Sequence, residues 1–187
     1  DLYPPTEDYE AYLTRNTVTI AELLKEAEYN NYTVGKWHLG GTSHGGKGPH
    51  EWDFDHSYGI YTGGANHWNQ GVFHLDPTNP VTAQELAAGE IPTVQDEPYY
   101  EDCQLVDRPI GIYSDDLYTT KILEYLEAGR PTGKTFFAYV ACTTPHAPLQ
   151  APDFLIDKYF DHYYNLGYEG LKRDRFETQK ARGIIPA

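Results

Sequence analysis

Residues 32–40 read Tyr-Thr-Val-Gly-Lys-Trp-His-Leu-Gly, and this stretch decides the fold that we expect. Residues 32–34 are β-branched or aromatic, which predicts a short buried strand. Gly35 lets the backbone leave that strand without a Cβ clash. Lys36 and His38 would share one face if the chain stayed extended, and a cation beside an imidazole suits an anionic substrate. For an isolated Lys-x-His pair, a solvated lysine and a core histidine are more common, so the surrounding sequence must decide.

The composition limits the functions that are possible. The chain has 187 residues, 40% of them hydrophobic, which suits one domain or a large piece of one. Its formal net charge of −14 argues against nucleic acid and anionic membranes as partners. No apolar run is long enough to span a bilayer, and no signal-peptide pattern is present. Because the chain begins at Asp1 and lacks methionine, we expect a processed product or a fragment.

A helix is predicted immediately before the 32–34 strand. Thr19 and Glu22 have the spacing of a capping box. The apolar residues that follow have helical spacing and predict one buried stripe: Ile20, Leu23, Leu24 and Ala27. The helix is expected to run to about Tyr29. A helix followed by a strand is half of an α/β repeat.

The same order recurs later in the chain. Residues 114–116, Ser-Asp-Asp, predict a helix cap with carboxylates in the first turn, and Gly129 and Pro131 predict its end. The expected buried face of this helix is Tyr118, Ile122, Tyr125 and Leu126. Residues 135–142, TFFAYVAC, are almost continuously apolar, which predicts a central parallel strand covered on both faces. His146 follows its carboxyl end, where open α/β sheets bind ligands.

The remaining segments are less regular. Residues 40–48 form a glycine-rich loop without the Walker pattern, and residues 53–64 are aromatic and turn-rich. Residues 76–111 predict an ordered excursion such as a hairpin. Two further helical patterns cover residues 153–164 and 168–182. Cys103 and Cys142 leave two alternatives open, a disulfide or burial of Cys142 as a small hydrophobe.

Two helix–strand units thus deliver Lys36, His38 and His146 to what we expect to be one edge of a sheet. A lysine and two histidines can neutralise an anionic ester and move protons, because imidazole titrates near neutrality. Asn66, His67 and Trp68 could line the same pocket as substrate-binding residues. A plain surface loop is the more common arrangement for such a segment.

Four stretches resemble the type I sulfatases, an arylsulfatase-like family of the alkaline-phosphatase superfamily. They are residues 25–40 with GKWHLG, residues 53–59 DFDHSYG, residues 136–152 with FFAYVA and TPHAPLQAP, and residues 175–187. They occur in the family's order and cover most of the chain. The resemblance implies an α/β fold, a partial alkaline-phosphatase-like α/β/α sandwich with a mostly parallel sheet. Residues 1–187 would be an incomplete catalytic domain that lacks its N-terminal nucleophile segment and its C-terminal part.

The resemblance also implies roles for three residues in hydrolysing an anionic sulfate ester. Lys36 would bridge the sulfate and a formylglycine, and His38 would act as base on the formylglycine hydrate. His146 would protonate or stabilise the leaving-group oxygen. The family further implies calcium and an extracellular, periplasmic or lysosomal location. Aryl sulfates, sugar sulfates and sulfated polysaccharides all remain open as substrates.

Several family features differ or are missing. Glu28 and Asp53 stand where the family usually has glycine, and Asn31 stands where Ser or Thr is usual. No Cys or Ser lies in a Cys/Ser-x-Pro-x-Arg motif, and the family's paired N-terminal aspartates have no counterpart. The formylglycine and the main calcium ligands would therefore lie outside this chain, so we expect the 187-residue chain alone to be inactive and to depend on the remaining parts of its domain.

Two rival functions remain at this point. The chain could be a catalytically inactive sulfatase-like module that serves in binding or assembly. It could also be a zinc hydrolase of the same broad superfamily, such as a phosphodiester or phosphonate hydrolase. Five other histidines invite this zinc hypothesis, although their spacings match no usual zinc set. These histidines are His44, His50, His56, His67 and His74.

Overall fold

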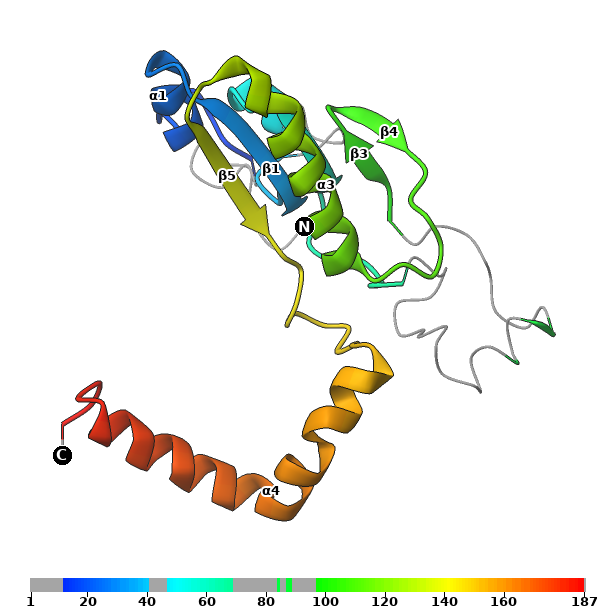
Figure 1. Cartoon of the computed structure of the whole chain (residues 1–187), viewed down its shortest axis with the longest axis vertical. Helices are drawn as coiled ribbons and strands as arrows, with labels where there is room; N and C mark the ends of the chain where they lie inside the picture. Colours follow the sequence, from blue (N-terminus) through cyan, green and yellow to red (C-terminus); the bar gives the residue numbers. More distant parts are fainter. Residues whose placement is uncertain (1–11, 41–46, 69–83, 85–86, 89–96, 187) are drawn as a thin grey trace, which may run out of the picture. The chain divides into compact units, whose positions relative to one another are not determined.

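The computed structural model describes residues 12–40, 47–68, 84, 87–88 and 97–186. The chain forms two compact units, Asp1–Gln150 and Ala151–Ala187 (Figure 1). The first unit contains α1 (Ile20–Glu26), β1 (Asn30–Lys36), the 3-10 helix η2 (Pro49–Trp52), β2 (His56–Ile60), β3 (Tyr99–Glu101), β4 (Gln104–Val106), α3 (Ser114–Gly129), the 3-10 helix η3 (Arg130–Thr132) and β5 (Phe136–Ala141). The second unit contains α4 (Asp153–Ala181).

The described strands form one sheet in the order β4-β3-β2-β1-β5. β1 is parallel to both β2 and β5, whereas β3 is antiparallel to β2 and to β4. Four of these five strands therefore run in one direction, and the predicted parallel pairing of β1 with β5 is confirmed. The β3–β4 hairpin confirms the hairpin expected within residues 76–111, whereas residues 76–83, 85–86 and 89–96 lie outside the described part.

Helices cover both faces of this sheet, as the α/β/α prediction requires. α3 packs along one face, over β1 and its neighbours (Figure 1). The core beneath it joins Tyr32 and Val34 of β1 to Tyr118 and Ile122 of α3. A second core on the other face joins residues of α1, η2 and the strand ends: Ala21, Trp37, Trp52, Phe54 and Tyr61. Successive strand residues alternate between these cores because side chains of a strand point to opposite faces.

The strands differ from prediction in three ways. β1 continues through Gly35 to Lys36, so Gly35 lies inside the strand, not at its exit. β2 occupies part of a segment predicted as turns. β5 has β1 as its one neighbour within the described sheet and is therefore an edge strand, not a central one. Consistent with an edge position, Phe136 is 54% exposed, and Cys142 is exposed and unpaired, so its predicted burial is wrong.

The helices begin and end close to the predicted positions. Thr19 and Glu22 form the predicted capping box of α1. The predicted stripe of α1 is wrong, because Ala21 is buried whereas Ile20 and Leu23 are more than half exposed. The predicted buried face of α3 is confirmed for Tyr118, Ile122 and Tyr125, and Leu126 packs against the same core.

The later helices, α3 and α4, each have one feature that the sequence did not predict. Tyr113, not Ser114, is the N-cap of α3 and makes no side-chain capping bond, although Asp115 and Asp116 do lie in the first turn. The two helical patterns of residues 153–182 form α4, which is kinked where Gly167 leaves the helical conformation. No helix in the described ranges is both long and apolar enough to cross a membrane.

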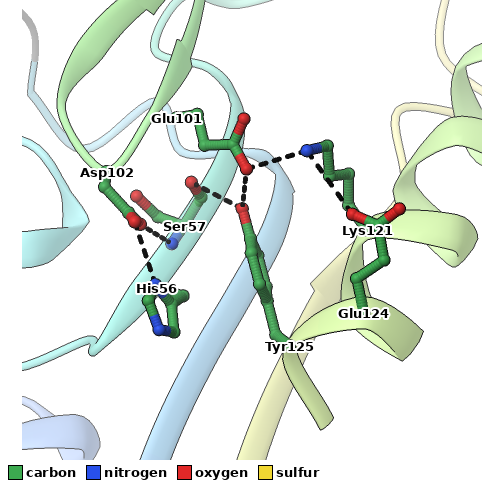
Figure 2. A network of polar contacts seen from close by, with 7 residues as sticks. All are labelled: His56, Ser57, Glu101, Asp102, Lys121, Glu124 and Tyr125. Atoms are coloured by element: carbon green, nitrogen blue, oxygen red, sulfur yellow. Dashed lines mark hydrogen bonds and ion pairs between the residues drawn. The ribbon is translucent and has the colours of Figure 1, made fainter. Parts of the chain in front are cut away.

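A polar network fastens the β3–β4 hairpin to the sheet and to α3 (Figure 2). Asp102 accepts hydrogen bonds from the Ser57 backbone N–H at 2.8 Å and contacts His56 Nδ1 at 2.9 Å. Glu101 accepts from Lys121 at 2.8 Å and from the Tyr125 hydroxyl at 3.0 Å. The network contains Ser, His and Asp but is not a catalytic triad, because Ser57 contributes its backbone N–H and its hydroxyl has no partner.

Candidate active site

The three predicted site residues follow the carboxyl ends of two adjacent strands. Lys36 is the last residue of β1, and Gly35 is in register with Ala141, the last residue of β5. His38 lies two residues beyond β1, and His146 lies five residues beyond β5. Because the two strands are parallel neighbours, both segments leave the sheet at the same edge.

Two glycines allow the strands to approach closely just before this edge. A Cβ atom on Gly35 would lie 2.6 Å from the Ala141 carbonyl carbon, and one on Gly59 would lie 2.7 Å from the Gly35 carbonyl carbon. Both distances are far below van der Waals contact. Gly35 also has a φ of 101°, which favours glycine. Position 35, just before Lys36, therefore requires glycine, because the backbones of β1, β2 and β5 meet there.

His38 occupies an unusual position at the sheet edge. Its φ is 50°, so the chain is not extended there, and the predicted same-face arrangement with Lys36 does not arise from strand periodicity. A Cβ atom on Gly63 would lie 3.2 Å from His38 Cε1, which places the imidazole against that glycine. Partial burial of the ring lowers the pKa of His38, and the positive charges of Lys36 and His146 lower it further. His38 is thus electrostatically coupled to both other residues.

His146 lies in a segment that folds back after β5. The His146 backbone N–H donates to the Thr143 carbonyl at 3.0 Å, which forms a tight turn. Its side chain is exposed, and Nδ1 lies 2.7 Å from the Ala147 carbonyl, to which it can only donate. Nε2 is then the nitrogen that remains for proton transfer with a bound molecule.

The structure buries Asn66, His67 and Trp68, which the sequence proposed as substrate-binding residues. They are 0%, 1% and 4% exposed, so the surface-loop alternative is wrong. The guanidinium of Arg108, itself 3% exposed, donates to the carbonyls of Asn66 and His67. Arg108 is an organising residue that sequence reasoning missed, because an isolated arginine in a proline-rich segment carries no signal of burial.

Metal ligation is not supported by the described residues. No group of three or more His, Cys, Asp or Glu side chains is placed to hold a metal ion within the described ranges. Of the zinc candidates, His50 is exposed, His56 pairs with Asp102, and His67 is buried. His44 and His74 lie outside the described residues. The family's calcium therefore does not fit these residues, and the chemistry below includes no calcium-dependent step.

The described edge can bind an oxyanion and move protons. Lys36 supplies a fixed positive charge, which stabilises charge on an oxyanion. The lowered pKa of His38 favours the neutral, proton-accepting form of its ring, whereas His146 leaves Nε2 for proton transfer because Nδ1 contacts the Ala147 carbonyl. Cys142, beside this edge, is not an activated nucleophile, because partial desolvation by neighbouring atoms and the charge of Asp115 raise the pKa of its thiol, although the residue is exposed.

Comparison with known proteins gives a consistent set of relatives. A sequence model described as "Sulfatase" matches residues 2–175. An arylsulfatase of Klebsiella aerogenes is 35% identical over 179 residues, covering 96% of this chain and 34% of that protein. Arylsulfatase J of Mus musculus is 32% identical over 155 residues, covering 82% of this chain and 22% of that protein.

The solved structures agree on the fold. The crystal structure of Ps i-CgsB in complex with k-i-k-neocarrahexaose is similar with a TM-score of 0.56 and 24% identity. The similarity covers 80% of this chain and 33% of that one. At this identity it supports the fold alone, the alkaline-phosphatase-like α/β architecture. The chain spans about a third of the length of the first curated relatives that it matches.

Proposed function

The chain belongs to the sulfatase family, the type I sulfatases of the alkaline-phosphatase superfamily, and from this premise we propose that it forms the anion-binding and acid–base part of an arylsulfatase-like active site. The observation that carries the proposal is the parallel register of β1 and β5, because it makes the segments that carry Lys36, His38 and His146 leave the sheet at one shared edge. We infer that a single small anion can contact all three groups there.

Lys36 holds the sulfate group in this proposal. It is the last residue of β1, and the glycine before it lets β1 and β5 approach closely, which fixes its backbone. The ammonium group then faces charge that develops on the sulfate oxygens in the transition state. Preorganised positive groups of this kind lower the barrier because they need no reorganisation during the reaction.

His38 acts as the base in the step that releases sulfate. A base must be neutral before it accepts a proton, and the lowered pKa keeps the imidazole neutral near pH 7. Contact with Gly63 limits the positions that its ring can adopt. Burial and the positive charge of Lys36 both favour this neutral form.

His146 protonates the oxygen of the departing alcohol or phenol. Its Nδ1 is satisfied by the Ala147 carbonyl, so Nε2 is the donor. General acid catalysis of this kind contributes roughly 10²–10⁴-fold and matters most for basic leaving groups. The described residues hold no activated nucleophile, and a formylglycine in another part of the protein would supply the covalent step.

Open apolar surfaces support the proposal that further parts of the same domain pack on this chain. β5 is an edge strand of the described sheet, and its Phe136, Tyr139 and Val140 are about half exposed. Exposed, apolar edge strands are sites for pairing with other chain segments. We therefore propose that another strand of the full protein covers β5, and that the calcium ligands also lie outside this chain. A location outside the cytosol is part of the same proposal.

The test is hydrolysis of a chromogenic aryl sulfate by the full-length protein and by the 187-residue chain alone, each with calcium. We expect turnover by the full-length protein and none by the chain alone, whose sequence contains no Cys/Ser-x-Pro-x-Arg motif. Lys36→Ala and His146→Ala should each abolish most of the full-length activity, whereas the matched exposed variant Lys134→Ala should retain it. A folded full-length protein that binds sulfate esters without turnover would favour the inactive binding module.

A further inference from the structure

The segment 143–150 carries His146, and we call it the His146 segment. Its two ends are fastened to other parts of the first unit. The Thr144 hydroxyl donates a hydrogen bond to the carboxylate of Asp115, which lies in the first turn of α3. Gln150 accepts from the Tyr113 hydroxyl at 2.8 Å through its carbonyl, and its side chain accepts from the His67 backbone N–H at 2.9 Å. The segment is therefore held between α3 and residues 66–68.

His67 lies at the centre of these contacts. Its imidazole is 1% exposed, and Nδ1 lies 2.7 Å from the Ser114 hydroxyl and 3.4 Å from the Thr143 hydroxyl. Burial is the largest influence on the ring and lowers its pKa, which favours the neutral form. The negative charge of Asp115 acts in the opposite direction, as does the nearby backbone of His146 and Pro148.

The ring of His146 itself has few restraints. It is exposed, and its hydrogen bond is to the carbonyl of the next residue, Ala147. The direction of this ring is therefore set by the backbone that carries it. His67 contacts the segment that contains this backbone near both of its ends, at the Thr143 hydroxyl and at the Gln150 side chain.

We propose that His67 is a positioning residue of the sulfatase reaction, and that it aims His146 by holding the His146 segment from the buried side, with its ring beside the Thr143 hydroxyl and its backbone N–H bonded to the Gln150 side chain. The inference rests on the proposed acid role of His146. It differs from the sequence prediction, because His67 acts from within the protein and does not contact substrate. Misplacing a catalytic group by about 1 Å can cost about 100-fold in rate, so the effect should be measurable.

The test compares variants of the full-length protein with aryl sulfates of good and poor leaving groups. His67→Phe keeps an aromatic ring near Tyr113, whose ring centroid lies 5.5 Å away, but removes both nitrogens. His67→Gln retains an amide donor. His50→Phe is the matched control, because His50 is exposed on η2. Circular dichroism checks that each variant is folded, and His67→Gln is judged by the same criteria if His67→Phe does not fold.

We expect His67→Phe to lower kcat by about 10–100-fold for poor leaving groups and by a much smaller factor for good ones, because misplacement impairs acid catalysis. His67→Gln should recover part of the loss, and His50→Phe should lose nothing. In a His146→Ala background, His67→Phe should have little further effect, since both changes remove the same contribution. An equal loss for all leaving groups, or a loss that adds fully to that of His146→Ala, would overturn the proposal.

These outcomes separate the inference from the function on which it rests. If His146→Ala alone slows all leaving groups equally, the acid role of His146 fails, and the positioning role fails with it. If His146→Ala is selective for poor leaving groups but both folded His67 variants are not, only the positioning role is wrong. A purely structural role for His67 predicts lowered stability without leaving-group selectivity.

Discussion

Substituting Gly35 by alanine perturbs the point at which β1, β2 and β5 meet. The added Cβ would lie 2.6 Å from the Ala141 carbonyl carbon and nearer still to its oxygen. Carbon atoms in contact prefer about 3.5–4.0 Å, so β5 must move away from β1 by roughly 1 Å. The substitution therefore forces apart the two strands that carry Lys36 and the His146 segment.

The expected cost has two parts. Gly35 has a φ of 101°, and an L-residue in a left-handed conformation costs about 1–2 kcal/mol. Overpacking of a close contact adds roughly 1–3 kcal/mol. The free energy of unfolding should thus fall by about 2–5 kcal/mol. Activity should also fall, because the displaced strand end carries Lys36.

Gly133→Ala is the matched control for this substitution. Gly133 has a φ of 67°, but a Cβ there meets no atom within 4 Å, so this variant carries the backbone cost without the clash. The assay is urea unfolding of the full-length protein, followed by tryptophan fluorescence. If Gly35→Ala costs no more than Gly133→Ala, the close approach of β1 and β5 does not exist as described.

Three further predictions concern the backbone and charge of the site. In an NMR titration, the pKa of His38 should lie below its usual value of about 6.5, and Lys36→Met should raise it because a neighbouring positive charge is removed; an unchanged pKa in Lys36→Met would contradict the coupling. Gly63→Ala should lower kcat with little loss of stability, because the added Cβ lies 3.2 Å from the His38 ring and moves it by a few tenths of an ångström; unchanged kcat would show that the ring does not rest there. Glu28→Gly should stabilise the protein by about 0.5–1 kcal/mol in thermal unfolding, because Glu28 has a φ of 62°, and a loss of stability would show that its side chain compensates for the strain.

Local sequence signals predicted much of the fold correctly. The capping box at Thr19 and the helical spacing of Tyr118, Ile122 and Tyr125 are local patterns, and both were confirmed. Continuous apolar composition located β5 but could not reveal its edge position, because strand order depends on distant segments. β2 was missed because Gly59 looks like a turn residue until Gly35 lies against it.

The family departures at Glu28 and Asp53 have a structural meaning. Both residues have positive φ, 62° and 63°, a backbone conformation that favours glycine. This conformation agrees with the glycine that the resemblance implies at both positions. The sequence alone could not show that Glu28 and Asp53 adopt it.

The positions of the candidate site residues after strand ends could be predicted from the sequence, whereas the residues that support them could not. Lys36, His38 and His146 follow strand ends, and strand ends can be read from the sequence. The contact of His67 with Ser114 joins residues 47 positions apart, and no spacing rule connects them. The roles of Lys36, His38 and His146 in catalysis stay predictions, to be decided by experiments on the full-length protein.

The central claim is that Lys36, His38 and His146 surround one sulfate group. The most direct measurement is a crystal structure of the full-length protein with a bound sulfate ester. We predict that Lys36 Nζ and a ring nitrogen of each histidine lie about 2.7–3.2 Å from oxygens of the ester. A sulfate ester bound at another edge of the sheet, with Lys36 and His146 directed away from it, would contradict the claim.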